Sequence, residues 1–238
     1  MPIPRIIYFC NKTLRGMPTA TAPWAALNPD YELRFYDDAM CEAFLATEYG
    51  PEYSDLFRWI KDGPIKADFW RICMLYKWGG VYSDVDNVPL VPIASFLNPT
   101  ADFVTCTSYW DKMGFNFNPN FIISSAANPI LKRCIDWYMT RPRDNYSYWD
   151  WSIMRAMTDT CHPTQFKKEA GIYSVDGQRI QLLKECAGKN HYDAHNTYNG
   201  IRIFNNRNAS WDHTTHSFTT VKHPPPLLMA QLARLIRK

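Results

Sequence analysis

The sequence predicts an α/β fold, in which strands alternate with helices. Three observations lead to this prediction. The β-branched and aromatic run at residues 3–10 is typical of a buried strand. A short strand pattern at residues 31–36 is followed at once by a helix pattern, and a longer helix pattern at residues 64–78 is followed by another strand. A strand–helix order that recurs favours parallel strands covered by helices.

The composition is that of a soluble globular protein. The 238 residues are 46% hydrophobic and 21% charged, which excludes a disordered chain and a collagen-like repeat. A net charge of +3 is too small to capture nucleic acid or anionic lipid by charge alone. The sequence shows no internal repeat and no low-complexity linker, so we expect one domain over residues 1–238.

The first quarter of the chain predicts two strands and a helix. The strands are Ile3–Cys10 and Tyr31–Tyr36, separated by a loop that contains Gly16, Pro18 and Pro23. Asp37 and Asp38 supply an N-cap for the helix Ala39–Tyr49, and Gly50-Pro51 ends it.

The clearest helix is Pro64–Trp78. Proline suits its first position, and one apolar stripe runs along it, formed by Ile65, Phe69, Ile72, Cys73 and Tyr76. Gly79-Gly80 ends the helix, because one glycine of the pair is free to take a left-handed conformation. A short strand begins directly afterwards at Val81 and runs into two acids.

The rest of the chain predicts fewer elements. Two further strands are Phe103–Thr107 and Asn120–Ser125, and a further helix is Pro129–Thr140. Residues 160–200 give no firm pattern. A short amphipathic helix is predicted at residues 226–238, docked on its own domain.

The cysteines and the chain start point to a cytosolic protein. The seven cysteines are odd in number, scattered and never spaced C-x-x-C, which argues against a disulfide framework and a zinc knuckle. No secretory signal and no long apolar run are visible, so we expect no integral membrane association. We expect the cytosol of a bacterium or of a phage-infected host.

Asp84 and Asp86 form a D-x-D pair at the end of the strand that follows the double glycine. On a regular strand, residues two positions apart project from the same face. Mn²⁺ and Mg²⁺ prefer oxygen ligands and often keep places for substrate phosphates. The pair therefore predicts a site for a metal and a diphosphate; a solvated turn is the alternative for D-x-D alone.

The surroundings of the pair carry a resemblance. The segment reads Ala67-Asp68-x-x-Arg71-x-x-x-Leu75-Tyr76-x-x-Gly79-Gly80-x-Tyr82-x-Asp84-x-Asp86. It resembles the signature of the D-x-D glycosyltransferases of the Och1-type mannosyltransferase and capsular sugar transferase family, glycosyltransferase family 32, which is similar to the catalytic domain of clostridial glucosylating toxins. Further matches are Ile3–Ile7, Asn120–Ser124 and Ser210-Trp211.

The resemblance implies a GT-A fold, with a mixed, mostly parallel sheet flanked by helices. It implies a UDP- or GDP-sugar donor, Mn²⁺ or Mg²⁺, and transfer with retention at the anomeric carbon. Asp86 would bind the metal directly, and Asp84 would hold donor hydroxyls or bind metal through water. Asp68, Arg71 and Tyr82 would contact the donor sugar. Ser210 and Trp211 would close on the diphosphate.

The chain departs from the family pattern in three places, one of which is the absence of the Gly-Pro pair that the family has after the mid-chain helix. After the first strand the family often has His and Trp where this chain has Tyr8 and Asn11, so Tyr8 or Phe9 is expected to stack on the base. Before Ser-Trp the family commonly has histidines, whereas this chain has asparagines. An asparagine carbonyl can ligate a hard cation, so Asn206 or Asn208 is expected to complete the metal site.

The acceptor is open. Trp149, Asp150 and Trp151 form either an acceptor-sugar platform or part of the core. A glycan is the default acceptor by family analogy, and a protein or a hydroxymethylated base of phage DNA is the alternative. Two other functions compete with sugar transfer: a Mg²⁺-dependent phosphohydrolase of the haloacid-dehalogenase type, whose nucleophile motif is also D-x-D, and a sugar-binding protein without catalysis.

Overall fold

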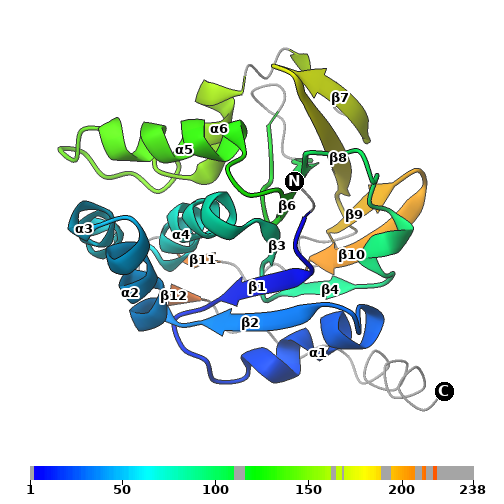
Figure 1. Ribbon diagram of the computed structural model, residues 1–238, viewed down its shortest axis with the longest axis horizontal. Helices are drawn as coiled ribbons and strands as arrows, with labels where there is room; N and C mark the ends of the chain where they lie inside the picture. The colour runs from blue at the N-terminus through cyan, green and yellow to red at the C-terminus, as the bar shows by residue number, and fades with distance from the viewer. Residues whose placement is uncertain are drawn as a thin grey trace.

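The structure is a computed structural model that describes residues 3–109, 116–161, 165–167, 169–188, 194–206, 211–212 and 217–218. Its centre is a ten-stranded sheet of order β2-β1-β3-β6-β5-β8-β9-β10-β4, with β7 added beside β8 (Figure 1). The strands are β1 Ile6–Cys10, β2 Glu32–Tyr36, β3 Gly80–Ser83, β4 Asn87–Pro89, β5 Phe103–Thr107, β6 Phe121–Ser124, β7 Gly171–Val175, β8 Gln178–Cys186, β9 His195–Tyr198 and β10 Ile201–Asn206. A separate two-stranded sheet pairs β11 Trp211–Asp212 with β12 Ser217–Phe218.

The sheet is mixed and most of its strands run parallel to one another, as predicted. Parallel pairing joins β1 to β2, β1 to β3 and β5 to β8. Antiparallel pairs with β6 and β9 stand between these groups. Following the pairings, β1, β2, β3, β5, β8 and β10 all run in one direction. The carboxyl ends of these strands therefore lie along the same edge of the sheet, where open α/β sheets bind ligands.

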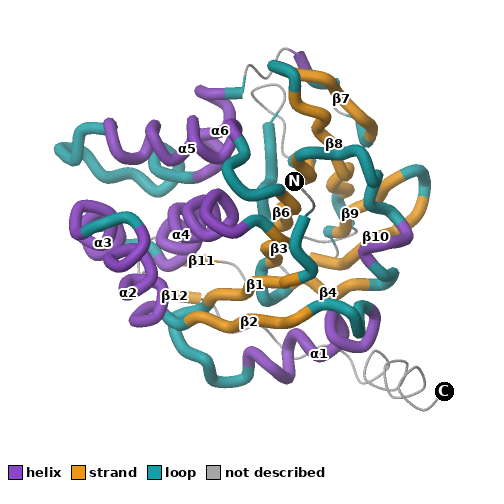
Figure 2. The backbone as a smooth tube through the Cα atoms, in the orientation of Figure 1, coloured by secondary structure: helices purple, strands orange, loops and turns teal. Residues whose placement is uncertain are grey.

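Helices cover both faces of the sheet (Figure 2). They are α1 Met17–Leu27, α2 Asp38–Glu48, α3 Pro51–Trp59, α4 Gly63–Trp78, α5 Pro129–Thr140 and α6 Ile153–Thr160, with a 3₁₀ turn at Ile93–Ser95. Helices α2 to α6 gather on one side of the sheet, and α1 lies on the other (Figure 1).

Strand β1 shows how the sheet separates two apolar cores. Successive side chains of a strand point to opposite faces. Ile7 and Phe9 pack in the core that contains Trp24 of α1, whereas Tyr8 packs in the larger core that contains Phe69 of α4. The face on which a β1 side chain lies thus decides which core it joins.

The double glycine after α4 is required by both backbone conformation and space. Gly79 and Gly80 have φ of 67° and 110°, values that side-chain-bearing residues rarely adopt. A Cβ on Gly79 would lie 2.7 Å from the Ala126 nitrogen, and one on Gly80 would lie 2.9 Å from a ring carbon of Tyr8. This close packing brings the end of α4 directly into β3.

Helices α1, α3 and α6 were not predicted. The loop expected around Gly16, Pro18 and Pro23 is wrong, because this segment forms helix α1 with Pro18 in its first turn and Pro23 inside it. Burial of Trp24 at 1% exposure outweighs the poor helix propensity of the inner proline. Pro51, taken as part of a stop signal, begins the next helix, α3.

Within residues 160–200, which gave no firm pattern, the described residues include strands β7, β8 and β9. The helix predicted at residues 226–238 lies outside the described residues. Among the residues that are described, no helix has the length and apolar character needed to span a bilayer.

Candidate active site

The two acids of the D-x-D motif lie in a turn. Strand β3 ends at Ser83, and the Asn87 backbone N–H donates to the Asp84 carbonyl at 3.1 Å. The Asp84 N–H donates to the Asn120 carbonyl at 2.9 Å, which fixes the start of the turn against the entry to β6. The expectation that both carboxylates share one strand face is therefore wrong, because Asp86 is inside a tight turn and not on a continuing strand.

Helix α4 supplies a cation that holds two carboxylates. Asp68 and Arg71 are three residues apart, so they lie on one helix face. Arg71 Nη2 lies 2.9 Å from Asp68 Oδ1 and 3.3 Å from Asp84 Oδ1. Arg71 Nη1 donates to the Pro119 carbonyl at 2.6 Å. The guanidinium therefore connects the helix, the D-x-D turn and the loop before β6.

Tyr82, on strand β3, completes this cluster. Its hydroxyl donates to Asp84 Oδ1 at 2.8 Å, and the Arg71 guanidinium lies 4.2 Å from its ring centroid. The Cys10 sulfur lies 3.7 Å from the same hydroxyl. Tyr82 is 1% exposed, so it acts as a buried support for both the cation and the carboxylate.

Burial changes the acid–base behaviour of the cluster. Burial raises the pKa of Asp68 to about 6, although Arg71 and the Ile153 N–H oppose this rise. Burial by itself would lower the pKa of Arg71, but Tyr82, Asp84 and Asp68 outweigh it and raise that pKa. Burial also raises the pKa of Tyr82 well above its ordinary value. Arg71 therefore stays charged, while Asp68 titrates close to neutral pH.

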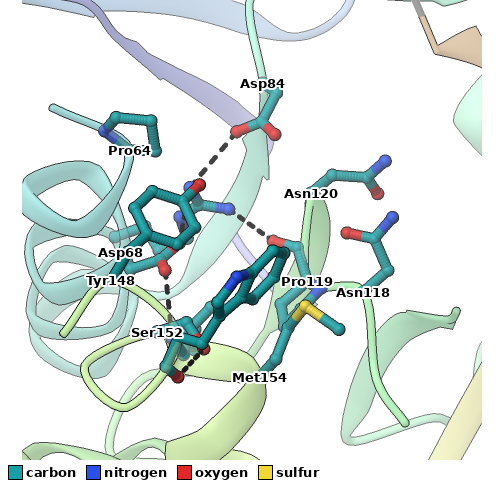
Figure 3. Close-up of a pocket in the computed structure, with 12 residues that line it drawn as sticks. Pro64, Asp68, Asp84, Asn118, Pro119, Asn120, Tyr148, Ser152 and Met154 are labelled. Atoms are coloured by element: carbon teal, nitrogen blue, oxygen red, sulfur yellow. Dashed lines mark hydrogen bonds and ion pairs between the residues drawn. The ribbon is translucent and has the colours of Figure 1, made fainter. Parts of the chain in front are cut away.

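A cavity of about 130 Å³ opens above the cluster. Figure 3 shows Asp84 at one end, with Asn118 and Asn120 on one wall and Tyr148 and Ser152 toward the other. The full lining comprises Pro64, Asp68, Arg71, Asp84, Asn118, Pro119, Asn120, Tyr148, Trp149, Ser152, Ile153 and Met154. Carboxylate, guanidinium, amide and aromatic groups thus converge on one small space, as the hydroxyls and ring face of a monosaccharide require.

Asp68 also anchors the wall opposite α4. The Ile153 N–H, at the start of α6, donates to Asp68 Oδ2 at 3.0 Å. The Ser152 hydroxyl caps the same helix by accepting from the Arg155 N–H at 3.3 Å. The hydrogen bond to Asp68 ties the start of α6, which follows the segment of Tyr148 and Trp149, to the cluster.

The two aromatic residues expected to stack on a base lie on opposite faces of β1. Tyr8 is beside Tyr82 in the β1–β3 register, and its hydroxyl is buried with no hydrogen-bond partner among the described residues. Phe9 is fully buried on the other face, with its ring 5.7 Å from that of Phe35. Tyr8 is also fully buried, in the core on its own face. The expectation that Tyr8 or Phe9 stacks on the base is therefore wrong, because both rings are core side chains that are closed to a ligand.

The aromatic segment before α6 divides into surface and core. Trp149 is 61% exposed and lines the cavity, and Asp150 is also exposed. Trp151 is fully buried, with its ring centroid 4.7 Å from that of Trp59. An acceptor platform that includes Trp151 is therefore wrong, since this ring is part of the core.

Asn206 lies close to the D-x-D turn. It pairs with Asn87 in the β10–β4 register, and Asn87 directly follows Asp86. Its side-chain carbonyl is buried and has no hydrogen-bond partner among the described residues. Asn208 and Ser210 lie outside the described residues, and Trp211 is described only as backbone in β11. Within the described part of the chain, no three His, Cys, Asp or Glu side chains gather as a metal site.

Two residues of this region were missed as site residues. Asn120 is 8% exposed, lines the cavity and has a side-chain carbonyl without a partner among the described residues. Its place directly before β6, in a segment that matched the family pattern, was a usable signal. Glu185 is 3% exposed on β8 and accepts hydrogen bonds from Asn118 and Asn206. No local pattern marks Glu185, because its partners are distant in sequence.

Comparison with known proteins confirms the predicted resemblance. Residues 17–104 match the family profile described as "Glycosyltransferase sugar-binding region containing DXD motif". The "Initiation-specific alpha-1,6-mannosyltransferase" of Candida albicans is 25% identical over 171 residues, which are 70% of this chain and 40% of that protein. An uncharacterized glycosyltransferase of Acanthamoeba polyphaga mimivirus is 32% identical over 102 residues, 43% of this chain and 39% of that protein. The chain thus spans about two fifths of the length of these curated relatives.

The fold has a solved counterpart. The structure titled "PaToxG Glycosyltransferase" superposes with a TM-score of 0.53 at 14% identity, covering 68% of this chain and 69% of that one. This likeness and the mixed sheet confirm the GT-A fold predicted from the sequence.

Proposed function

Because the chain carries the DXD region of the Och1-type glycosyltransferases, we propose that it transfers a monosaccharide from a nucleotide-diphospho-sugar to an acceptor hydroxyl. The observation that carries the proposal is the cluster of Asp68, Arg71, Tyr82 and Asp84 under the cavity. The family profile supports a sugar-binding role for this region, because residues 17–104 include all four. We propose that residues 1–238 act as one catalytic domain.

The donor sugar binds in the cavity in this proposal. The Asp68 carboxylate and the Arg71 guanidinium both line it, so they can accept from and donate to sugar hydroxyls. Tyr8 is as fully buried as Phe9, so we assign neither ring to the nucleotide. Ser210 and Trp211 remain candidates for the diphosphate.

The residues at the D-x-D turn fit a hard divalent cation, Mn²⁺ or Mg²⁺. Asp86, Asp84 and the buried side-chain carbonyl of Asn206 offer the oxygen ligands that such ions prefer, and Asn208 is a further candidate. When bound, the cation supplies positive charge that offsets the charge developing on the leaving diphosphate. Arg71 keeps Asp84 oriented toward this edge through the ion pair at 3.3 Å.

Retention without a covalent intermediate suits this cavity. Asp68 and Asp84 are its carboxylates among the described lining residues, and Arg71 holds both of them. A carboxylate committed to a guanidinium is a poor nucleophile. We propose that the acceptor attacks from the face of the departing diphosphate, which takes the acceptor proton. Trapping of a glycosyl-enzyme would contradict this step.

The proposed acceptor is a glycan. Trp149 presents an exposed ring at the cavity, and the apolar face of a sugar can pack on such a ring. The seven cysteines are all free thiols, which supports a reducing compartment such as the cytosol. A protein or a modified DNA base as acceptor is an outcome of the experiment below.

The test is donor turnover. The protein is incubated with Mn²⁺ and UDP- and GDP-sugars in turn, and released nucleotide is measured without acceptor and with glycan, protein or hydroxymethylated DNA. We expect slow donor hydrolysis that is lost with a chelator and in Asp86→Ala, and retained in Asp144→Ala, a matched change at an exposed acid. Phosphate release from simple phosphomonoesters, or donor binding without turnover, would overturn the proposal.

A further inference from the structure

Glu185 is a buried acid that the proposed reaction does not use. It is the penultimate residue of β8, whose carboxyl end lies on the same sheet edge as the D-x-D turn. Only 3% of the residue is exposed. A carboxylate is rarely buried to this degree unless other groups satisfy its oxygens.

The groups that satisfy Glu185 belong to two other parts of the edge. Its Oε1 accepts from Asn118 Nδ2 at 2.6 Å and from Asn206 Nδ2 at 2.9 Å. Its Oε2 accepts from the Tyr109 backbone N–H at 3.2 Å. The Ser108 side chain also hydrogen-bonds to Glu185. All four partners are neutral, so the carboxylate acts as a hydrogen-bond acceptor between the segment that joins β5 to β6 and the end of β10.

This arrangement fixes which way the Asn206 amide points. An ionised carboxylate only accepts hydrogen bonds, so it selects the NH₂ group of the amide and turns the carbonyl away. Asn206 is 1% exposed, and its Oδ1 has no hydrogen-bond partner among the described residues. A buried carbonyl without a partner is costly unless a ligand satisfies it.

The two asparagines lie on different sides of the proposed site. Asn206 faces Asn87 in the β10–β4 pairing, next in the chain to Asp86. Asn118 lines the sugar cavity together with Asp84. One oxygen of Glu185 therefore connects the candidate cation ligand to the wall of the cavity.

We infer that Glu185 is a positioning residue, which orients the Asn206 carbonyl toward the cation and holds Asn118 in the wall of the sugar cavity. The inference rests on the proposed function for its cation. Residues that hydrogen-bond to metal ligands commonly change metal affinity 10- to 100-fold when replaced.

The test measures binding of Mn²⁺ alone to the full chain by electron paramagnetic resonance, without donor or acceptor. In Glu185→Gln the new amide presents its NH₂ either to Tyr109 N–H or to the two asparagines. If the NH₂ faces Tyr109, it and the backbone N–H are two donors that face each other. If the NH₂ faces the asparagines, both asparagine amides must reverse to present their carbonyls. We expect about a tenfold loss of Mn²⁺ affinity in this variant.

The matched control is Glu169→Gln. Glu169 borders the same cavity of about 350 Å³ as Glu185 and pairs with Lys184 at 2.7 Å, but its side chain is 67% exposed. This variant removes the same charge and is expected to bind Mn²⁺ as the parent does. In an Asn206→Ala background, Glu185→Gln is expected to cause little further loss, because both changes remove the same oriented carbonyl.

Mn²⁺ affinity unchanged in Glu185→Gln would overturn the inference, as would an equal loss in Glu169→Gln. If Glu185→Gln does not fold, Glu185→Asp decides: weaker binding than the parent supports the inference, and equal binding overturns it. Failure of the proposed cation site is distinguishable, because the parent protein would then not bind Mn²⁺ or Asp86→Ala would bind it equally well.

Discussion

Arg71 of helix α4 holds Asp84 of the turn after β3, with 3.3 Å between Nη2 and Oδ1. The same nitrogen lies 2.9 Å from Asp68 Oδ1, so two carboxylates share one guanidinium. The side chains of Arg71 and Asp68 are 5% and 11% exposed. The position of the first acid of the D-x-D motif is thus set by an ion pair with a buried guanidinium.

Removal of the guanidinium is expected to destabilise the protein strongly. Arg71→Met leaves Asp68 and Asp84 close together without their cation, and breaking a buried pair in this way costs about 3–5 kcal/mol. Urea unfolding measures the loss. Asp68→Asn added to Arg71→Met should recover part of it, because one uncompensated charge is removed. Arg58→Met, at an exposed ion pair, is the control and should change stability far less.

The pKa of Asp68 predicts a pH-dependent stability. Burial raises this pKa from 3.8 to about 6 in the folded protein. Between these two values the folded state holds a proton that the unfolded state releases, so the contribution of Asp68 to stability falls as pH rises, by up to about 3 kcal/mol. Asp68→Asn has no such proton. We expect the difference in unfolding free energy between parent and variant to fall from pH 4 to pH 7 in urea titrations; a constant difference would contradict the prediction.

Trp149 and Trp151 are expected to respond in opposite ways. Trp149 is 61% exposed at the cavity, so Trp149→Ala should change stability by less than about 0.5 kcal/mol and raise the KM for the acceptor. Trp151 is fully buried, so Trp151→Ala should cost about 3–5 kcal/mol. Thermal unfolding and acceptor titrations measure the pair, and an unchanged acceptor KM in Trp149→Ala would remove the platform role.

Gly79 and Gly177 are expected to differ in their tolerance of alanine. Both have positive φ, 74° at Gly177 and 67° at Gly79, and the ψ of −171° at Gly79 places that residue in a region essentially confined to glycine. A Cβ at Gly177 meets no atom within 4 Å, whereas a Cβ at Gly79 lies 2.7 Å from the Ala126 nitrogen. Urea unfolding should therefore show a larger loss for Gly79→Ala than for Gly177→Ala. Equal losses of unfolding free energy in the two variants would mean that the backbone at Ala126 moves aside without a measurable change in stability.

The sequence predicted best where the signals are local. The apolar stripe of α4, the proline at its start and the double glycine at its end lie within 20 residues, and their positions agree with the structure. The two-residue turn Asp176-Gly177, with positive φ at both positions, joins β7 to β8, and this dipeptide is a hairpin signal that was overlooked.

Contacts between residues far apart in the sequence were harder to predict. Phe9 and Tyr8 are adjacent and both aromatic, and only the packing of α1 and α4 on opposite faces shows which core each joins. Glu185 meets Asn118, 67 residues earlier, and Asn206, 21 residues later. Such a contact depends on the order of strands in the sheet, which periodicity does not encode.

The Asp68 carboxylate accepts a hydrogen bond from the Ile153 N–H and also lines the proposed sugar cavity. Replacing Asp68 removes both the hydrogen bond that holds the start of α6 and a carboxylate that lines the sugar cavity. We therefore expect few substitutions to be tolerated at this position. Diversification toward other hexoses or pentoses is therefore expected to proceed through neighbours such as Met154 and Tyr148, which line the same cavity. A mutational library aimed at new donors should keep the aspartate and randomise those two.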